Sequence, residues 1–206
     1  MRASPFILCS TLALAGACTA ASAYEKGDLL VRGGIHYVDP KSDSLGNLEV
    51  QPAAALTGSA EYFLNPQLAV DLLVAFPFEH DVELAGTGNV AEVQHLPPTL
   101  SLVWYPAIGQ QWHPYVGAGL NYTIFFREKT RGPIAGQDLE LDPSFGAAAM
   151  VGIDWDLGDR WGLALDARYI DIDTDGELDG APMGNFESDP FIVGLSVSYR
   201  FRSTVR

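Results

Sequence analysis

The chain contains one acidic pattern whose spacing could bind a metal ion. Asp171, Asp173 and Asp175 alternate along the sequence and Gly176 follows them, as in the first half of a calcium-binding loop. Such a loop also needs a bidentate glutamate at its twelfth position, and Pro182 occupies that position here. We therefore interpret the segment as a solvated acidic loop and not as a calcium site.

Histidine and serine residues give no better basis for a reactive site. A Ser-His-acid triad can be named that includes Ser101, but nothing in the sequence fixes the three groups within reach of one another. The histidines fall on separate segments, without the i, i+2 spacing that would bring two of them to one face of a strand. They are His36, His80, His95 and His113. We predict no metal site, no other cofactor and no enzymatic activity.

Seven charged residues stand inside otherwise apolar segments. In each segment the charge takes a position between large apolar residues, so that the two kinds of side chain alternate. Because an unpaired buried charge is costly, charges that share an interior must form ion pairs. We predict a salt-bridged network that fills the interior, in preference to an ion-conducting path. Its members are Arg32, Glu61, Asp71, Asp154, Asp166, Arg168 and Arg200.

These charges lie on six of the eight segments of the sequence that have the two-residue period of β-strands. One face of each segment has large apolar residues, and the other has small, polar or charged residues. Four prolines prevent the uncharged stretch at residues 93–126 from forming a membrane-spanning helix. The predicted strands are residues 29–38, 53–64, 68–76, 100–104, 116–126, 144–155, 161–169 and 191–201.

The connections between these strands alternate in length. Those after the second, fourth and sixth strands are short, whereas the others are long and carry many charges. This rhythm is typical of a transmembrane β-barrel with short periplasmic turns and longer extracellular loops. Aromatic residues near the short turns match the girdle expected at a membrane boundary. They are Tyr62, Trp104, Trp155, Trp161, Tyr199 and Phe201.

We predict an all-β fold, an eight-stranded antiparallel transmembrane β-barrel. The competing interpretation is a soluble β-sandwich or lipocalin-like barrel whose apolar face forms the core. A soluble barrel needs its large apolar residues inside and its charges outside. Here the charged face is sparse and contains glycine and serine, which favours a small filled lumen and an apolar face turned to lipid.

The first 23 residues have the features of a secretory signal peptide. Arg2 precedes an apolar run over residues 6–17, and the small residues Ala21-Ser22-Ala23 form a cleavage site. Cleavage leaves residues 24–206 as a single barrel domain. It changes the net charge from −14 to −15, because the removed segment contains one arginine and no acid. This charge argues against nucleic acid as a partner. Lipidation at Cys18 is the less favoured alternative, since the lipoprotein-type site there is only approximate.

Five stretches of the sequence carry longer motifs. They are GDLLVR at 27–32 with VDP at 38–40, FPFEHD at 76–81, HLPPTL at 95–100, PYVGAGLNYT at 114–123 and RYIDIDT at 168–174. In this order, over essentially the whole chain after residue 23, they resemble the OmpW family of outer-membrane proteins.

The resemblance implies an eight-stranded barrel with a narrow, largely apolar interior. It also implies a role in the passage of small hydrophobic compounds, since relatives are associated with hydrocarbon uptake and stress tolerance. Family members usually end on the aromatic residue of a Tyr-Arg-Phe-like motif, which the barrel-assembly machinery reads. Here five residues follow Phe201, which departs from the family pattern. The machinery either tolerates this tail or recognises the last strand differently.

An eight-stranded barrel has room only for its own side chains or one slim ligand. We predict passive uptake of small hydrophobic molecules, which reach the outer mouth and leave sideways into outer-membrane lipid by hydrophobic transfer. The loop at residues 79–95 either lines this mouth or only extends two strands above the membrane. The residues predicted to line the mouth are Phe76, Phe78, Leu96, Phe125 and Phe126.

We expect a monomer in the cell outer membrane. A second function stays open at this point: a structural or stress-related protein without transport, whose acidic loops serve as a docking site for phage or bacteriocin.

Overall fold

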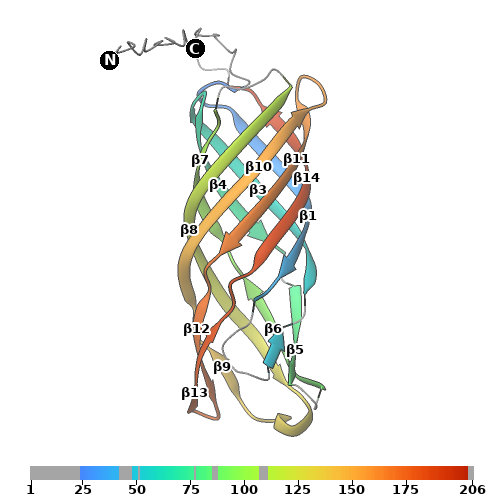
Figure 1. The fold of residues 1–206 in the computed structure, drawn as a ribbon, viewed down its shortest axis with the longest axis vertical. Coiled ribbons are helices and arrows are strands. Elements are labelled where there is room, and N and C mark those ends of the chain that lie inside the picture. Colours follow the sequence, from blue (N-terminus) through green and yellow to red (C-terminus); the bar gives the residue numbers. More distant parts are fainter. Residues whose placement is uncertain are drawn as a thin grey trace, which may run out of the picture.

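The computed structural model describes residues 24–41, 48–50, 52–76, 78–84, 88–106 and 111–203. The barrel strands are β1 (Leu29–Asp39), β3 (Ala53–Asn65), β4 (Leu68–Ala75), β7 (Thr99–Trp104), β8 (Trp112–Thr130), β10 (Ser144–Asp156), β11 (Trp161–Ile170) and β14 (Phe191–Phe201). They pair antiparallel in the order β10, β11, β14, β1, β3, β4, β7 and β8, and the pairing of β10 with β8 closes the circle (Figure 1). The predicted eight-stranded barrel is confirmed, and each predicted strand overlaps one of these.

Strand β8 is longer than the predicted strand at residues 116–126. Pro114 does not end β8, and it lies opposite Ile153 of β10. A proline lacks the N–H donor and is tolerated in a strand where the ladder does not need that donor. At its other end β8 runs to Thr130, where Ala91 of a neighbouring strand still pairs with it. The barrel wall on this side therefore continues beyond the other strands.

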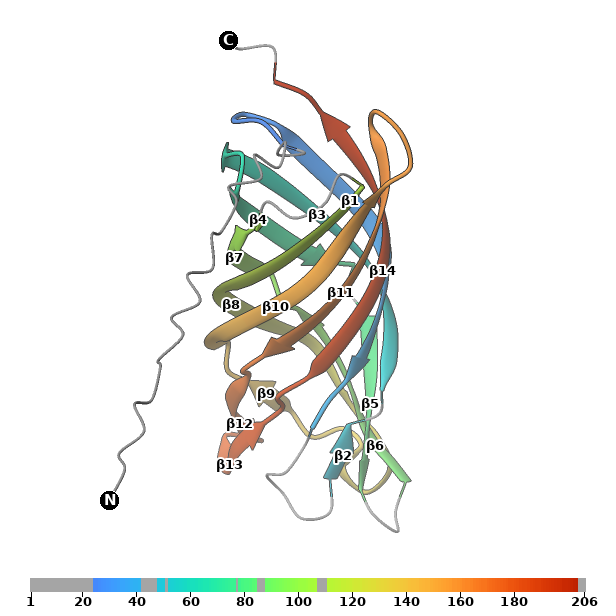
Figure 2. The same cartoon turned by 45° about the horizontal axis from the view of Figure 1, so that its top comes forward.

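Six further strands of the described residues lie at the end of the barrel that carries the long loops (Figure 2). They are β2 (Leu48–Val50), β5 (Phe78–Leu84), β6 (Gly88–Leu96), β9 (Leu139–Leu141), β12 (Asp173–Leu178) and β13 (Ala181–Glu187). Strands β5 and β6 pair with each other, and β6 also pairs with β8, so the described part of residues 79–95 extends the wall. A 3₁₀ turn, η1 (Gly132–Ile134), follows β8. Among the described residues, no helix is long and apolar enough to cross a membrane.

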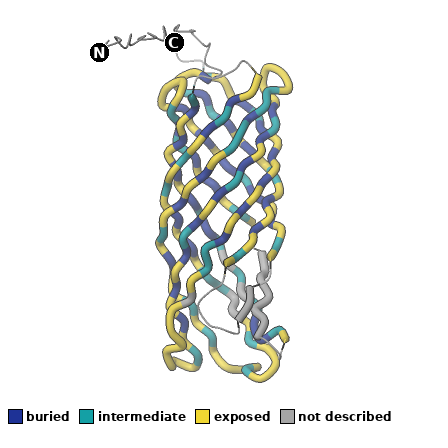
Figure 3. Tube along the Cα trace, viewed as in Figure 1, coloured by how far each residue is buried: buried dark blue, intermediate teal, exposed yellow. Residues whose placement is uncertain are grey.

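The two faces of the barrel wall have opposite character. Large apolar side chains point outward: Ile35 is 58% exposed, Leu120 53% and Leu195 60%. The inward positions between them are buried, and Figure 3 shows the resulting alternation along every strand of the barrel. A wall with large apolar side chains outside and polar ones inside is the reverse of a soluble barrel and suits a lipid environment.

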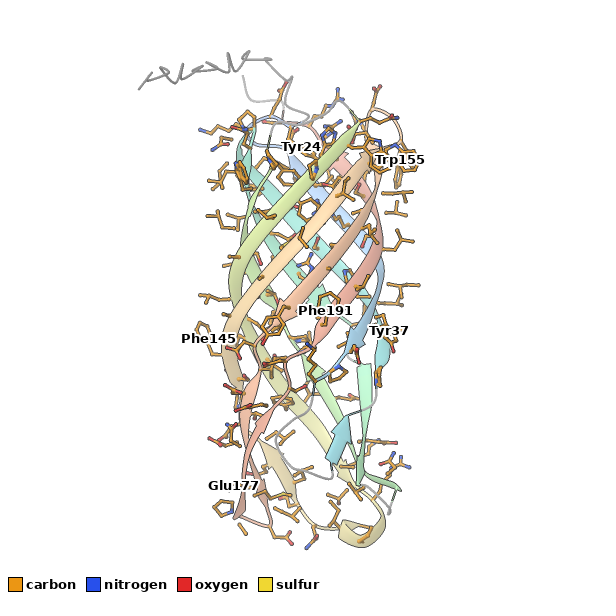
Figure 4. All side chains as sticks on the ribbon, in the orientation of Figure 1. Tyr24, Tyr37, Phe145, Trp155, Glu177 and Phe191 are labelled. Carbon is orange, nitrogen blue, oxygen red and sulfur yellow. The ribbon has the colours of Figure 1, made fainter. Side chains whose placement is uncertain are left out.

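Aromatic residues mark both boundaries of this apolar surface. At the short-turn end the rings of Trp112 and Trp155 stack at 4.7 Å, and Tyr199 lies edge-on to Trp161 at 4.8 Å. Farther along the strands, Tyr37, Phe145 and Phe191 are exposed at the opposite end of β1, β10 and β14 (Figure 4). The short-turn group includes members of the girdle that the sequence predicts.

Candidate functional site in the barrel lumen

Six of the seven predicted charges lie together at mid-barrel, and we call them the charge layer. Arg32 of β1 is their centre: its Nη2 lies 2.8 Å from Oδ2 of Asp154 on β10, and its Nη1 contacts Glu61 of β3. The same Nη1 is 3.8 Å from Oδ1 of Asp71 on β4. All four side chains are buried, so one guanidinium joins carboxylates from three separate strands.

A second guanidinium extends the charge layer towards β11. Nε of Arg168 donates to Oδ2 of Asp166 at 2.8 Å, and its Nη1 donates to Oδ2 of Asp71 at 3.3 Å. Asp166 also lies 3.2 Å from Nε2 of His36, whose Nδ1 is 2.6 Å from the hydroxyl oxygen of Thr57. Two guanidiniums thus hold four carboxylates, and an imidazole completes the layer.

Arg200, the seventh predicted charge, lies apart from these ion pairs. It is buried near the periplasmic end, where its guanidinium carbon lies 5.5 Å from the centre of the Tyr24 ring. Its Nη2 donates to the backbone carbonyl of Asp159 at 3.0 Å. Its place is therefore next to the aromatic residues of that end.

Between the charge layer and the periplasm lies a group that sequence reasoning missed, which we call the periplasmic aromatic cluster. It consists of Tyr24, Leu30, Phe63, Ala69, Val103, Tyr105, Tyr115 and Met150. The cluster is bonded to the charge layer, since Nη2 of Arg32 donates to the hydroxyl of Tyr105 at 2.8 Å. Leu30, Phe63 and Val103 occupy inward positions of their strands. The two-residue period of the sequence could therefore have assigned them to the lumen.

At the extracellular end of the lumen lies a second missed group, which we call the outer apolar cluster. Its members are Val38, Ala148, Ile170, Ile172 and Ile192, with Phe125 packed against them. Val38 is opposite Ile192 and Ala148 is opposite Ile170 in the ladders. The members that lie in strands share the inward parity of the charges, so part of the outer lumen is apolar, whereas the buried side chains of Asn121, Thr123 and Ser144 keep another part of it polar.

The five residues predicted to line the mouth are not brought together. Phe125 packs on the outer apolar cluster, whereas Phe76 points outward and is 68% exposed. Leu96 and Phe126 are partly buried on β6 and β8. The side chain of Phe78 lies outside the described residues. A ligand-binding role for these residues remains a prediction, and Phe76 is not an inward-facing lining residue because its parity in β4 is that of the lipid-facing positions.

Pro97 and Pro98 separate β6 from β7 and interrupt the wall on one side. The β4–β7 ladder ends at the pair Leu73 and Thr99, and the β5–β6 ladder starts at Phe78 and His95. Neither proline has an N–H to donate to a neighbouring strand. We call this interruption the β4–β7 seam.

On the other side Pro98 is tied to β8. The carbonyl of Pro98 accepts hydrogen bonds from the backbone N–H of Tyr122 at 3.0 Å and from Nδ2 of Asn121 at 3.3 Å. Asn121 Nδ2 also donates to Oγ1 of Thr99 at 3.0 Å, and Thr123 Oγ1 donates to Asn121 Oδ1 at 2.7 Å. Since these polar groups bond one another, they stiffen the edge of the seam instead of offering free donors.

The segment compared with a calcium-binding loop is partly a strand. Asp173 lies in β12, opposite Glu187 of β13, and among the described residues no group of three or more His, Cys, Asp or Glu side chains is placed to hold a metal ion. Partial desolvation, with the negative charges of Asp171 and Asp189, raises the pKa of the Asp173 carboxyl above its ordinary value. The arrangement is one of mutual repulsion.

The closed barrel, with its apolar outer wall and filled polar interior, defines this chain as an outer-membrane β-barrel protein. The chain belongs to the OmpW family, whose family model matches residues 25–201. Outer membrane protein W of Escherichia coli (strain K12) is 37% identical over 194 residues, which are 88% of this chain and 92% of that protein. Outer membrane protein AlkL of Ectopseudomonas oleovorans is 36% identical over 185 residues, 86% of this chain and 76% of that protein.

Solved structures agree with this assignment. The crystal structure of the outer membrane protein OprG from Pseudomonas aeruginosa superposes with a TM-score of 0.75 at 29% identity, covering 87% of this chain and 98% of that one. The family and the fold are those of outer-membrane barrels and not of enzyme families.

Proposed function

We propose that this protein admits small hydrophobic molecules through the outer membrane, taking them up at the outer mouth and releasing them sideways into lipid. The observation that carries the proposal is a spatial order: the outer apolar cluster lies at the extracellular end, the charge layer lies beneath it, and the wall is interrupted at the β4–β7 seam. Each part contributes one step.

The charge layer argues against passage straight along the barrel axis. Arg32, Glu61, Asp71 and Asp154 are all buried and held by ion pairs that span several strands. A hydrophobic molecule that passed through them would have to separate buried ion pairs, and leaving one such charge without its partner costs about 3–5 kcal/mol. A cargo that enters from outside therefore needs another exit.

The outer apolar cluster gives such a molecule a reason to enter. A compound the size of an aromatic side chain buries about 150 Å² of apolar surface, which at about 25 cal/mol per Å² favours leaving water by roughly 4 kcal/mol. Val38, Ile170 and Ile192 are packed together just above the charge layer, so a molecule that parts them would exchange water for apolar neighbours there. The transfer energy belongs to leaving water, so the later step from one apolar environment into lipid carries no hydrophobic penalty.

The β4–β7 seam is the exit that the geometry supports. Backbone ladders join most neighbouring strands of the barrel. Here Pro98 directs its carbonyl to β8, so by alternation Pro97 faces the β4 side, where it has no N–H to donate. By register, outward-facing Phe76 lies about level with the prolines, so a lipid-facing aromatic stands beside the opening. Because the Phe76 side chain is exposed on the lipid-facing side, it is better placed beside an exit than on the lining of the lumen.

The proposal is tested by the uptake of a hydrophobic fluorescent probe, N-phenyl-1-naphthylamine, into lipid vesicles that contain the purified protein. We expect faster uptake than in empty vesicles. Ile192→Thr, which adds a hydroxyl to the outer apolar cluster, should slow uptake several-fold, and Ile192→Val, which keeps it apolar, should not. Equal rates in vesicles with and without protein would remove the proposal.

A further inference from the structure

Tyr24 occupies the periplasmic end of the lumen, although it precedes the first strand by several residues. Its ring is stacked on Phe63 with centroids 4.2 Å apart, and it meets Tyr105 and His113 edge-on at 5.1 and 5.5 Å. Its hydroxyl donates to Oδ2 of Asp154 at 3.0 Å. Only 3% of the residue is exposed, so a residue ahead of the barrel fills space inside it (Figure 4).

The four residues after Tyr24 fix it in that place. The carboxylate of Asp28 accepts from the backbone N–H of Glu25 at 3.1 Å and from that of Ser203 at 2.9 Å. Gly27 donates its N–H to the carbonyl of Phe63 at 2.8 Å and has φ of 89°, a left-handed conformation that favours glycine. One carboxylate thus ties the segment before β1 to the residues that follow β14, and one glycine permits the turn.

The position of the ring matters because of what lies directly behind it. Asp154 accepts from Tyr24 on one side and pairs with Arg32 on the other. The guanidinium of Arg200 lies over the Tyr24 ring at 5.5 Å, within the range of a cation–π contact. Without the ring, the periplasmic side of the Arg32–Asp154 pair would face the solvent that the ring now displaces.

We infer that residues 24–28 form a cork that closes the periplasmic end of the lumen to water and polar solutes. The cork keeps the charge layer dry from below, and buried ion pairs hold more strongly in a dry, low-dielectric interior than in water. This role goes beyond hydrophobic uptake, because it concerns the end of the barrel that the proposed cargo does not use. It stands or falls independently of the lateral exit.

The test measures thiol accessibility at the inner side of the cork. Both native cysteines, Cys9 and Cys18, precede Tyr24, so a protein produced from residue 24 onward has no background thiol. Ala69 is fully buried in the periplasmic aromatic cluster, and Ala69→Cys adds a single small probe there. The reagent is the membrane-impermeant cation 2-(trimethylammonium)ethyl methanethiosulfonate, which forms a mixed disulfide with the thiol and releases methanesulfinate.

In the otherwise unchanged protein we expect slow modification of Ala69→Cys. Adding Tyr24→Ala should raise the rate at least tenfold, whereas Tyr24→Phe, which keeps the ring, should change it by no more than a few-fold. Gln67→Cys in the exposed turn before β4 is the matched control and should react rapidly in every background. Heat-dependent migration in detergent gels verifies that each variant is folded.

Asp28→Ala provides a second, independent variant, because it leaves the Tyr24 ring intact and removes only the clamp. It should also raise the rate at Ala69→Cys. The inference is overturned if Ala69→Cys reacts as rapidly in the unchanged protein as Gln67→Cys, or if it stays protected in both the Tyr24→Ala and the Asp28→Ala proteins. Neither result would bear on uptake of the hydrophobic probe, which is measured separately.

Discussion

Arg32 and Asp154 join two strands that are not neighbours: Nη2 lies 2.8 Å from Oδ2 although β11 and β14 stand between β1 and β10. Nε of Arg32 adds a second bond to Oδ1 of the same carboxylate at 3.3 Å. This two-bond contact braces the barrel from within. Planar pairing of this kind is specific to arginine and is not reproduced by lysine.

We therefore expect Arg32→Ala to lower the free energy of unfolding by about 3–5 kcal/mol, because Glu61 and Asp154 would remain buried without their cation. Arg32→Lys should cost less, since it keeps the charge and loses the planar geometry. The measurement is urea unfolding in lipid vesicles, followed by tryptophan fluorescence. An Arg32→Ala barrel as stable as the unchanged protein would show that the pair is not a structural brace.

The Asn121 side chain supports a prediction about the edge of the seam. Its amide donates to the Pro98 carbonyl and to Thr99, and Asn121→Ala would leave buried Thr99 and Thr123 short of a partner. We expect a loss of about 1–3 kcal/mol in the free energy of unfolding, the usual cost of unsatisfied buried polar groups. Thr123→Val is the comparison variant and should cost less, since it removes only the hydrogen bond from Thr123 to Asn121.

Restoring backbone donors at the seam tests the lateral exit directly. Replacing Pro97 and Pro98 with threonine provides two N–H groups. The one at residue 97 faces the β4 side and would let the β4–β7 ladder extend past Leu73 and Thr99, whereas the one at residue 98 faces β8. We expect a folded barrel whose uptake of N-phenyl-1-naphthylamine is several-fold slower. Pro106→Thr, near the short-turn end, is the matched control and should leave the rate unchanged. An unaltered rate in the double variant would argue that cargo leaves elsewhere.

Alternation along the strands was sufficient to place the charges inside. Arg32, Asp71 and Asp154 each alternate with the large apolar residues of their strands, so a closed barrel whose apolar face meets lipid has to place them inside. Which acid meets which guanidinium was not predictable: Arg168 and Asp71 are 97 residues apart, and their contact depends on barrel closure and strand tilt. The sequence therefore specified the members of the charge layer but not its connections.

The outer apolar cluster and the periplasmic aromatic cluster were missed for different physical reasons. Val38, Ile170 and Ile192 were within reach of the same parity rule, but apolar residues on a polar face at strand ends resemble an irregularity of the pattern. Tyr24 belongs to no periodic segment, and its place is set by contacts with Phe63 and by the clamp between Asp28 and Ser203. Contacts of that kind are tertiary and leave no local trace.

The acidic hairpin outside the barrel should respond to pH. Desolvation and the charges of Asp171 and Asp189 raise the pKa of Asp173, so the folded state binds this proton more tightly than the unfolded chain does. Ionised Asp173 therefore destabilises the hairpin at neutral pH, and this effect disappears as the pH falls through the raised pKa. Protection factors for hydrogen exchange of the β12–β13 amides, which are corrected for the intrinsic pH dependence of exchange, should rise as the pH falls through the raised pKa of Asp173, and Asp173→Asn should weaken that dependence. An equal change in Asp173→Asn would assign the effect to other groups.

Gly194 and His36 form a pair whose coupling can be measured. A Cβ built on Gly194 would overlap the imidazole ring of His36, and that ring is held in place by Asp166 and Thr57. Gly194→Ala must therefore displace the ring and disturb both partners, and overpacking of this kind costs about 1–3 kcal/mol in the free energy of unfolding.

The same substitution should cost clearly less in a His36→Ala background, because the ring that it would displace is already gone. The coupling is obtained from a double-mutant cycle of urea unfolding in vesicles, and we expect an interaction of about 1 kcal/mol or more between the two sites. Gly33→Ala is the matched control, because a Cβ at Gly33 meets no atom within 4 Å, and its effect should be the same with or without His36. Additive costs for Gly194→Ala and His36→Ala would mean that the histidine ring does not need the space that this glycine leaves.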